Sequence, residues 1–191
     1  MASIGLFRGL NFHVVEHFLD APACRRYVDA MRAASGLPAR VALGSPDNLT
    51  VADDLRRTMR IEVKPGIAEE LVASLEAVRD QSARHFDVVL ARTEDPQFLR
   101  YRQGDFYVRH MDRDLEGVNQ RKVSVIIFLN SPGAATFTGG GLKFYGVLAG
   151  RPVPFTLVPE EGLLIAFRSD IPHEVERVTA GERLTAVTWF A

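Results

Sequence analysis

Two histidines in this sequence stand two residues before an aspartate, a spacing that can give one metal ion two ligands. The pairs are His85 with Asp87 and His110 with Asp112. Alternate residues of a strand project to the same side, and two imidazoles with one carboxylate bind a first-row metal while leaving coordination positions open. The spacing alone is weak evidence, because the 191 residues include 24 Asp plus Glu.

The His85 pair is interpreted as structural. We expect a helix from Pro65 to about Arg84, because apolar residues recur there at helical spacing. His85 then lies at the end of this helix, where a cation offsets the negative terminus. Residues i and i+2 of a helix do not share a face, so His85 and Asp87 are not expected to bind one ion.

The His110 pair lies at the end of an expected strand, residues 106–111. Strict alternation assigns Phe106 and Val108 to the same face as His110. That face passes from apolar to polar side chains and continues to Asp112 in the loop beyond. The sequence therefore predicts an imidazole and a carboxylate at the mouth of a barrel.

A third ligand has to come from another part of the fold, and His173 is the candidate. It follows Pro172 and begins an expected strand at residues 173–178, so it is also a histidine at a strand end. The alternative interpretation is a solvated histidine at the start of a strand. The residues around His173 do not decide between the two.

Arg183 is predicted to be buried and to bind an anion. The final expected strand, residues 183–190, places Arg183 on the same face as the apolar Val187 and Trp189. An unpaired buried charge is costly, and the guanidinium fork matches a carboxylate in bidentate fashion. A ligand carboxylate is one interpretation, and an internal ion pair with an acid such as Glu160 or Asp170 is the other.

The elements that must position these residues are two early helices followed by many short strands. Asp20 is expected to cap the first helix, which ends before Gly36. The expected strands are 60–63, 98–101, 106–111, 123–129, 142–145, 153–158, 163–167, 173–178 and 183–190. Closely spaced strands without intervening helices predict an antiparallel sandwich or barrel, with the two helices packed against one sheet.

Composition excludes several classes of function. The net charge is -1, so no excess of positive charge is available for nonspecific nucleic-acid binding. The sequence contains no run of about 18 apolar residues, so no membrane span is expected. The first residues do not resemble a signal peptide. The one cysteine, Cys24, cannot form an internal disulfide, which fits the reducing cytoplasm. We therefore expect a cytoplasmic protein with neither nucleic acid nor membrane as partner.

Several motifs, taken in order, resemble the prolyl 4-hydroxylase-like branch of the Fe(II)- and 2-oxoglutarate-dependent dioxygenases. The motifs are Tyr101-Arg-Gln-Gly-Asp-Phe-Tyr-Val-Arg-His-Met-Asp112, Arg121-Lys-Val-Ser-Val-Ile-Ile-Phe-Leu-Asn130, Gly139-Gly-Gly-Leu-Lys-Phe-Tyr145, His173-Glu-Val, Arg183 and Trp189. The resemblance covers roughly residues 97–191 and implies a mainly β fold, a double-stranded β-helix or jelly roll with flanking N-terminal helices. It implies one domain over residues 1–191, with a helical support and lid region at 1–96 and the jelly-roll core at 97–191.

The resemblance also implies the roles of individual residues. His110, Asp112 and His173 would bind Fe(II), Arg183 would pair with the far carboxylate of 2-oxoglutarate, Tyr101 would help to hold that carboxylate, and Thr185 would line the pocket. Gly141 departs from the family pattern, because an acidic residue usually stands there in the glycine-rich turn. This departure is not expected to affect iron binding.

The implied reaction consumes 2-oxoglutarate and O2, releases succinate and CO2, and hydroxylates a C–H bond, with ascorbate as a reductant. Related halogenases lack the carboxylate ligand, so the presence of Asp112 favours hydroxylation. The first hypothesis for the substrate is a prolyl residue in a peptide or protein. The alternatives are hydroxylation or desaturation of a small-molecule metabolite, and a non-catalytic cupin-like binding protein. Residues 41–60 are a candidate lid, and the sequence predicts no oligomeric state.

Overall fold

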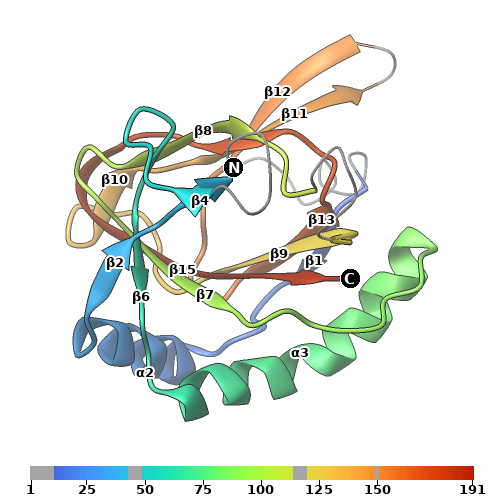
Figure 1. Ribbon diagram of the computed structural model, residues 1–191, viewed down its shortest axis with the longest axis horizontal. Coiled ribbons are helices and arrows are strands. Elements are labelled where there is room, and N and C mark those ends of the chain that lie inside the picture. Colours follow the sequence, from blue (N-terminus) through green and yellow to red (C-terminus); the bar gives the residue numbers. More distant parts are fainter. Residues whose placement is uncertain (1–10, 43–48, 114–119, 149–150) are drawn as a thin grey trace.

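Two facing antiparallel sheets form the centre of this protein, which is described here from a computed structural model (Figure 1). The structure describes residues 11–42, 49–113, 120–148 and 151–191. One sheet has eight strands and the other has five, and two short strands form a separate pair. This arrangement confirms the predicted mainly β jelly roll.

The sheets are built from strands that lie far apart in the sequence. In spatial order, the eight-stranded sheet contains β1 (His13–Val15), β13 (Leu164–Arg168), β9 (Val123–Phe128), β15 (Val178–Phe190), β7 (Gln97–Arg102), β6 (Met59–Ile61) and β2 (Gly36–Pro38), with β10 (Phe137–Gly139) paired to β15. The five-stranded sheet contains β12 (Arg151–Leu157), β11 (Leu142–Leu148), β14 (His173–Val175), β8 (Phe106–His110) and β5 (Arg56–Arg57). The remaining pair is β3 (Val41–Ala42) with β4 (Leu49–Thr50).

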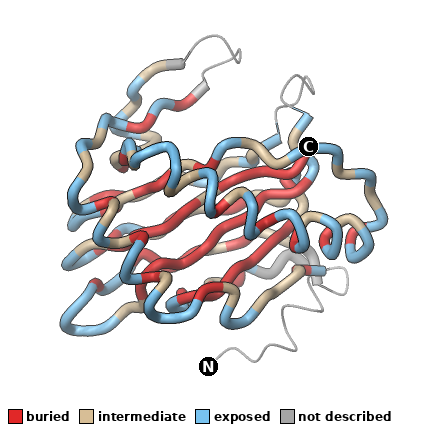
Figure 2. Tube along the Cα trace, turned by 90° about the horizontal axis from the view of Figure 1, so that it is seen from below, coloured by how far each residue is buried: buried red, intermediate tan, exposed pale blue. Residues whose placement is uncertain are grey.

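Both predicted helices are present and cover one face of the eight-stranded sheet. Helix α2 (Ala21–Arg32) is capped by Asp20, whose carboxylate accepts a hydrogen bond from the Ala23 backbone N–H at 2.8 Å. Helix α3 (Pro65–Phe86) begins at its proline and buries Leu71 and Leu75 completely. Figure 2, seen from the helix side, shows buried residues along the strands behind the exposed outer surfaces of the helices.

Two hydrophobic clusters hold the layers together. The first packs α2 and α3 against the eight-stranded sheet and includes Tyr27, Leu75 and Ile127. The second fills the space between the two sheets and includes Tyr101, Phe128 and other aromatic side chains. The alternating strands β9 and β15 contribute to both clusters, so the inner cluster lies where the predicted site residues project.

Two strand boundaries differ from the prediction in the same place. The expected strand at residues 173–178 ends at Val175, and Val178 already belongs to β15. The two intervening residues carry the chain from the five-stranded to the eight-stranded sheet, and the backbone N–H of Val178 donates to the carbonyl of Asp105. The buried residues Val175 and Val178 are three positions apart, so the alternation breaks where the chain changes sheet.

The predicted alternation along β8 is wrong because this strand contains a β-bulge. His110 is opposite His173, whereas Tyr107 is opposite Val175, so β8 advances three residues while β14 advances two. The extra residue places Tyr107 on the same side as His110, and their rings stack with 3.5 Å between centroids. Phe106 packs instead beneath the guanidinium of Arg177, at 4.3 Å.

The predicted lid region at residues 41–60 contributes strands to the fold. β5 pairs with β8, and β6 pairs with β7, so this segment joins both large sheets. Residues 43–48 of this segment lie outside the described residues. Among the helices that the structure describes, none is long and apolar enough to cross a lipid bilayer.

Candidate metal and co-substrate site

Three predicted ligands meet at one end of the space between the sheets. His110 and His173 are direct cross-strand partners on β8 and β14. Asp112 follows β8, and its backbone N–H donates to the carbonyl of Ser169 at 3.0 Å, which ties the loop to the end of β13. Asp112 Oδ1 lies 3.7 Å from His110 Nε2, and Asp112 Oδ2 lies 3.6 Å from His173 Nε2.

The hydrogen bonds of the two imidazoles leave the correct nitrogen available for a metal. His110 Nδ1 lies 2.8 Å from the carbonyl of Val108, and His173 Nδ1 lies 3.0 Å from the carbonyl of Ile171. Because a carbonyl oxygen only accepts, each Nδ1 carries the proton in these contacts. Each Nε2 therefore presents its lone pair toward the third ligand, and this kind of second contact orients histidines that bind metals.

The electrostatics of the cluster favour the protonation states that a metal requires. Burial, together with the neighbouring His173, lowers the pKa of His110 to about 3. Burial acts to raise the pKa of Asp112, but the two imidazoles hold it below its ordinary value. Neutral imidazoles and an ionised carboxylate are the forms that bind divalent metals, so these pKa shifts favour metal binding.

The donor set fits a divalent iron ion. One ligand atom from each of His110, Asp112 and His173 lies within 4.8 Å of the others. Two imidazoles and one carboxylate on one face of the ion leave three adjacent coordination positions for co-substrate and oxygen. The other histidine–aspartate pair is not part of this cluster: His85 lies in the last turn of α3, where its ring stacks with that of His13.

Arg183 is a buried cation without a counter-charge among the described residues. Its side chain comes from β15 and is 1% exposed. Neither Nε nor Nη2 has a hydrogen-bond partner, and Nη1 reaches only Thr185 Oγ1, at 3.5 Å. Of the two acids considered as internal partners, Asp170 lies next to Arg168 instead, and Glu160 is exposed. Burial lowers the pKa of Arg183 to about 10.

Aromatic rings and a close turn shape the surroundings of Arg183. Its guanidinium carbon lies 5.2 Å from the ring centre of Tyr101 and 5.4 Å from that of Phe128. The turn before β11 passes close by: Gly140 has a φ of +65°, and a Cβ there would stand 3.0 Å from Arg183 Cδ. The absence of a side chain at Gly140 therefore leaves space beside the Arg183 side chain.

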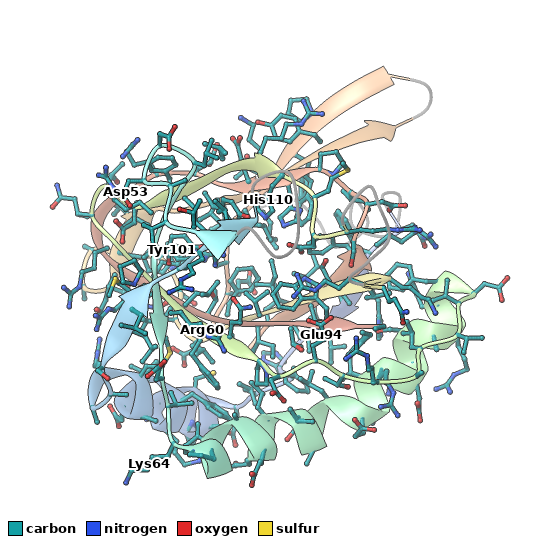
Figure 3. All side chains as sticks on the ribbon, in the orientation of Figure 1. Asp53, Arg60, Lys64, Glu94, Tyr101 and His110 are labelled. Carbon is teal, nitrogen blue, oxygen red and sulfur yellow. The ribbon has the colours of Figure 1, made fainter. Side chains whose placement is uncertain are left out.

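Tyr107 packs against the metal cluster, and this position was not found from the sequence. Its ring stacks on His110, and burial raises its pKa to about 12, although the nearby charge of Arg56 acts to lower it. Strict alternation had assigned Tyr107 to the outer face. Figure 3 labels Tyr101 and His110, which come from the two different sheets.

A second group missed by the sequence analysis surrounds Trp189. The guanidinium of Arg121 lies 3.5 Å from the Trp189 ring centre, and Glu94 accepts hydrogen bonds from Arg121 Nε and Nη2. Glu94 lies before β7 and Arg121 before β9, so only the tertiary structure brings them together. No local pattern in the sequence indicated this contact.

The fold and this site together define an oxygenase of the double-stranded β-helix type. Residues 96–191 match the 2OG-Fe(II) oxygenase superfamily, and the chain belongs to this family. The family's cofactors, Fe(II) and 2-oxoglutarate with O2, agree with the three-residue cluster and the unpaired guanidinium.

Curated relatives resemble the second half of the chain. A PKHD-type hydroxylase from Acaryochloris marina is 39% identical over 92 residues, which cover 48% of this chain and 39% of that protein. A PKHD-type hydroxylase from Sphingopyxis alaskensis is 37% identical over 104 residues, or 52% of this chain and 45% of that protein. The chain thus spans less than half the length of these relatives.

Solved structures resemble nearly the whole chain. A prolyl-4-hydroxylase from Pseudomonas putida superposes with a TM-score of 0.76 and 26% identity, covering 99% of this chain and 96% of that one. A Trichoplax adhaerens prolyl hydroxylase, solved with a peptide fragment of hypoxia inducible factor, has a TM-score of 0.78 and 17% identity. The superposition covers 97% of this chain and 86% of the Trichoplax chain. At 17% identity the similarity supports the fold alone.

Proposed function

We propose that this protein is an Fe(II)- and 2-oxoglutarate-dependent hydroxylase of prolyl residues in peptides or proteins. The observation that carries the proposal is the pairing of two features within one jelly roll. A cluster of two histidines and one aspartate stands at the end of the inter-sheet space. A buried guanidinium with two unpartnered nitrogens, Arg183, lies against Tyr101 and Phe128 of the cluster between the sheets.

In this proposal His110, Asp112 and His173 bind Fe(II), and Arg183 binds the distal carboxylate of 2-oxoglutarate. The carbonyls of Val108 and Ile171 hold the two imidazoles with Nε2 toward the metal. Bound Fe(II) and 2-oxoglutarate supply, with O2, an oxidant that transfers one oxygen atom to a C–H bond while succinate and CO2 are released. The aromatic residues of the inner cluster exclude water from this space.

Arg183 has a further role in orienting the co-substrate. A planar guanidinium recognises a carboxylate through two parallel hydrogen bonds, and Nε and Nη2 are the pair of nitrogens without partners. Thr185, whose hydroxyl is already close to Nη1, lines the same pocket in this proposal. Tyr101 helps to hold the same carboxylate and, across the strand pair, limits where the guanidinium can move.

The prolyl substrate is supported by relatives rather than by a residue of this chain. Two curated relatives are named PKHD-type hydroxylases, and a structure at 26% identity is a prolyl-4-hydroxylase. We therefore propose a peptide rather than a free metabolite as the substrate.

The proposal is tested in two stages. Anaerobic addition of Fe(II) and 2-oxoglutarate to the protein is expected to produce a weak visible charge-transfer band, and O2 should then yield succinate. Neither signal is expected from the His110→Ala or Asp112→Ala variant. A folded wild-type protein that gives neither the band nor succinate would favour the non-catalytic binding protein.

The second stage identifies the substrate. Prolyl peptides and a panel of small metabolites are incubated with the enzyme, 2-oxoglutarate, O2 and ascorbate, and mass spectrometry follows the gain of one oxygen atom. Oxygen gain on proline in peptides supports the proposal. Oxygen gain or desaturation on a metabolite, with none on peptides, would replace it with the small-molecule alternative.

A further inference from the structure

A second arginine, Arg56, lies beside the metal cluster and is held there by the backbone. It belongs to β5, the edge strand of the five-stranded sheet, and stands directly opposite Tyr107 on β8. The Val108 N–H donates to the carbonyl of Leu55 at 2.9 Å, which anchors the same short strand. The position of Arg56 relative to β8 is therefore set by sheet pairing.

The side chain of Arg56 is directed toward the site by an aromatic contact. Its guanidinium carbon lies 4.7 Å from the centre of the Tyr107 ring, and that ring stacks on His110 at 3.5 Å. These two contacts keep the guanidinium within about 8 Å of the His110 ring. An extended peptide advances about 3.3 Å per residue, so this distance corresponds to two or three residues of a bound substrate.

The charge of Arg56 is not neutralised within the described part of the protein. Its Nε is buried without a hydrogen-bond partner, and its Nη1 donates a hydrogen bond to the backbone carbonyl of Arg40, at 3.2 Å. Arg121, by contrast, is paired with Glu94. A half-buried guanidinium on an aromatic face, without a carboxylate partner, is suited to bind one from outside.

We propose that Arg56 recognises a carboxylate of the peptide substrate, within about three residues of the prolyl residue that is hydroxylated. The inference rests on the proposed prolyl hydroxylase function and names a substrate class within it: acidic peptides. The carboxylate can belong to an Asp or Glu side chain or to a peptide C-terminus, because the guanidinium fork binds both alike.

The test compares matched peptides on the anaerobic protein loaded with Fe(II) and 2-oxoglutarate. Each peptide carries one proline, with Glu or Gln at a chosen neighbouring position, and a second series ends in a free carboxylate or in an amide. Dissociation constants are measured by fluorescence anisotropy, and oxygen gain is then followed in air by mass spectrometry. We expect the acidic member of at least one pair to bind about tenfold more tightly, as hydrogen bonds to charged groups allow.

The neighbouring Arg57 supplies a matched control. It is exposed on the same strand and stands opposite Phe106, on the other face. Arg56→Gln should reduce the ratio of acidic to neutral affinities to near one, whereas Arg57→Gln should keep it. Arg56→Lys retains the charge without the fork and should keep part of the ratio, and thermal melting of each variant confirms folding.

The possible failures are distinguishable. If peptides gain oxygen on proline with no acidic preference, or if the preference survives Arg56→Gln, this inference is overturned and the proposed function stands. If succinate forms but no prolyl peptide binds or gains oxygen, the proposed substrate is overturned and this inference with it. Added salt offers an independent check, because screening should weaken an acidic preference that depends on charge.

Discussion

Arg183 and Tyr101 are direct partners across β15 and β7, and the guanidinium of Arg183 lies 5.2 Å from the centre of the Tyr101 ring. The ring and the Thr185 hydroxyl are weak substitutes for a counter-charge. A buried cation in this position destabilises the protein until an anion binds, since desolvation is not repaid. Two predictions about the ligand-free and liganded protein follow from this contact.

The first prediction concerns the stability of the ligand-free protein. Burial lowers the pKa of Arg183 from 12.5 to about 10, which corresponds to a cost on the order of 3 kcal/mol for the charged form. The cost is present at neutral pH. It is relieved as the pH rises through about 10, because the folded protein then releases the proton while the unfolded chain still holds it. Arg183→Met should therefore raise the melting temperature of the ligand-free protein by about 6–12 °C.

Calorimetry of the variant checks this prediction, with Arg60→Met as the control because Arg60 is exposed. The same Arg183→Met variant should lose the stabilisation by 2-oxoglutarate that the wild type shows, which is about 2.7 kcal/mol at a hundred times the dissociation constant. A variant that melts lower than the wild type and still responds to 2-oxoglutarate would contradict the assigned role.

The metal cluster predicts a difference between the two histidine–aspartate pairs. Asp112→Ala should weaken Co(II) or Fe(II) binding by more than about a hundredfold, because loss of an outer contact alone costs 10- to 100-fold. His85→Ala should leave binding unchanged, since His85 stacks with His13 away from the cluster. Anaerobic calorimetric titration measures both affinities. Equal weakening in the two variants would argue against the cluster as the metal site.

The packing of α3 against the eight-stranded sheet predicts that shortening one core side chain lowers the stability of the protein substantially. Leu75 is fully buried in the outer hydrophobic cluster. Leu75→Ala should lower the free energy of unfolding by about 2–5 kcal/mol, as large-to-small substitutions in a core do. Gln81→Ala, on the exposed side of the same helix, should change it by less than about 0.5 kcal/mol. Urea denaturation measures both, and similar effects would contradict the described packing.

Protonation of His13 is expected to contribute to the pH dependence of folding stability. Its Nδ1 lies 2.8 Å from Ser82 Oγ, and burial, with a smaller contribution from His85, lowers its pKa below 6.5. The unfolded chain therefore takes up the proton first, and folding stability declines as the pH falls below 6.5. Because His13 is only half-buried, the contribution is expected to be less than about 1 kcal/mol.

Comparison of His13→Gln with the wild type at pH 7.5 and pH 5.5 isolates this contribution. The variant should lose less stability over that interval, as measured by urea denaturation. The exposed His17 offers a control, and His17→Gln should behave like the wild type. A His13 resonance in NMR that titrates above 6.5 would refute the prediction directly.

The sequence was sufficient where the information is local. The cap at Asp20 and the apolar spacing of α3 predicted both helices, because helix formation depends on neighbours within one or two turns. The burial of Arg183 followed from the alternation along the last strand, and the absence of an obvious acidic partner anticipated its unpaired guanidinium.

The rest depends on contacts between strands that are far apart in the chain. One extra residue in β8 turns Tyr107 inward beside His110, and this is invisible to a period-two pattern. Arg56 reaches Tyr107 only because β5 pairs with β8, about fifty residues later in the sequence. Residue types and local spacing thus determined which side chains were able to do chemistry. Sheet register decided which of these side chains lie on the same face and how far apart they are, because register is set by pairing with distant strands.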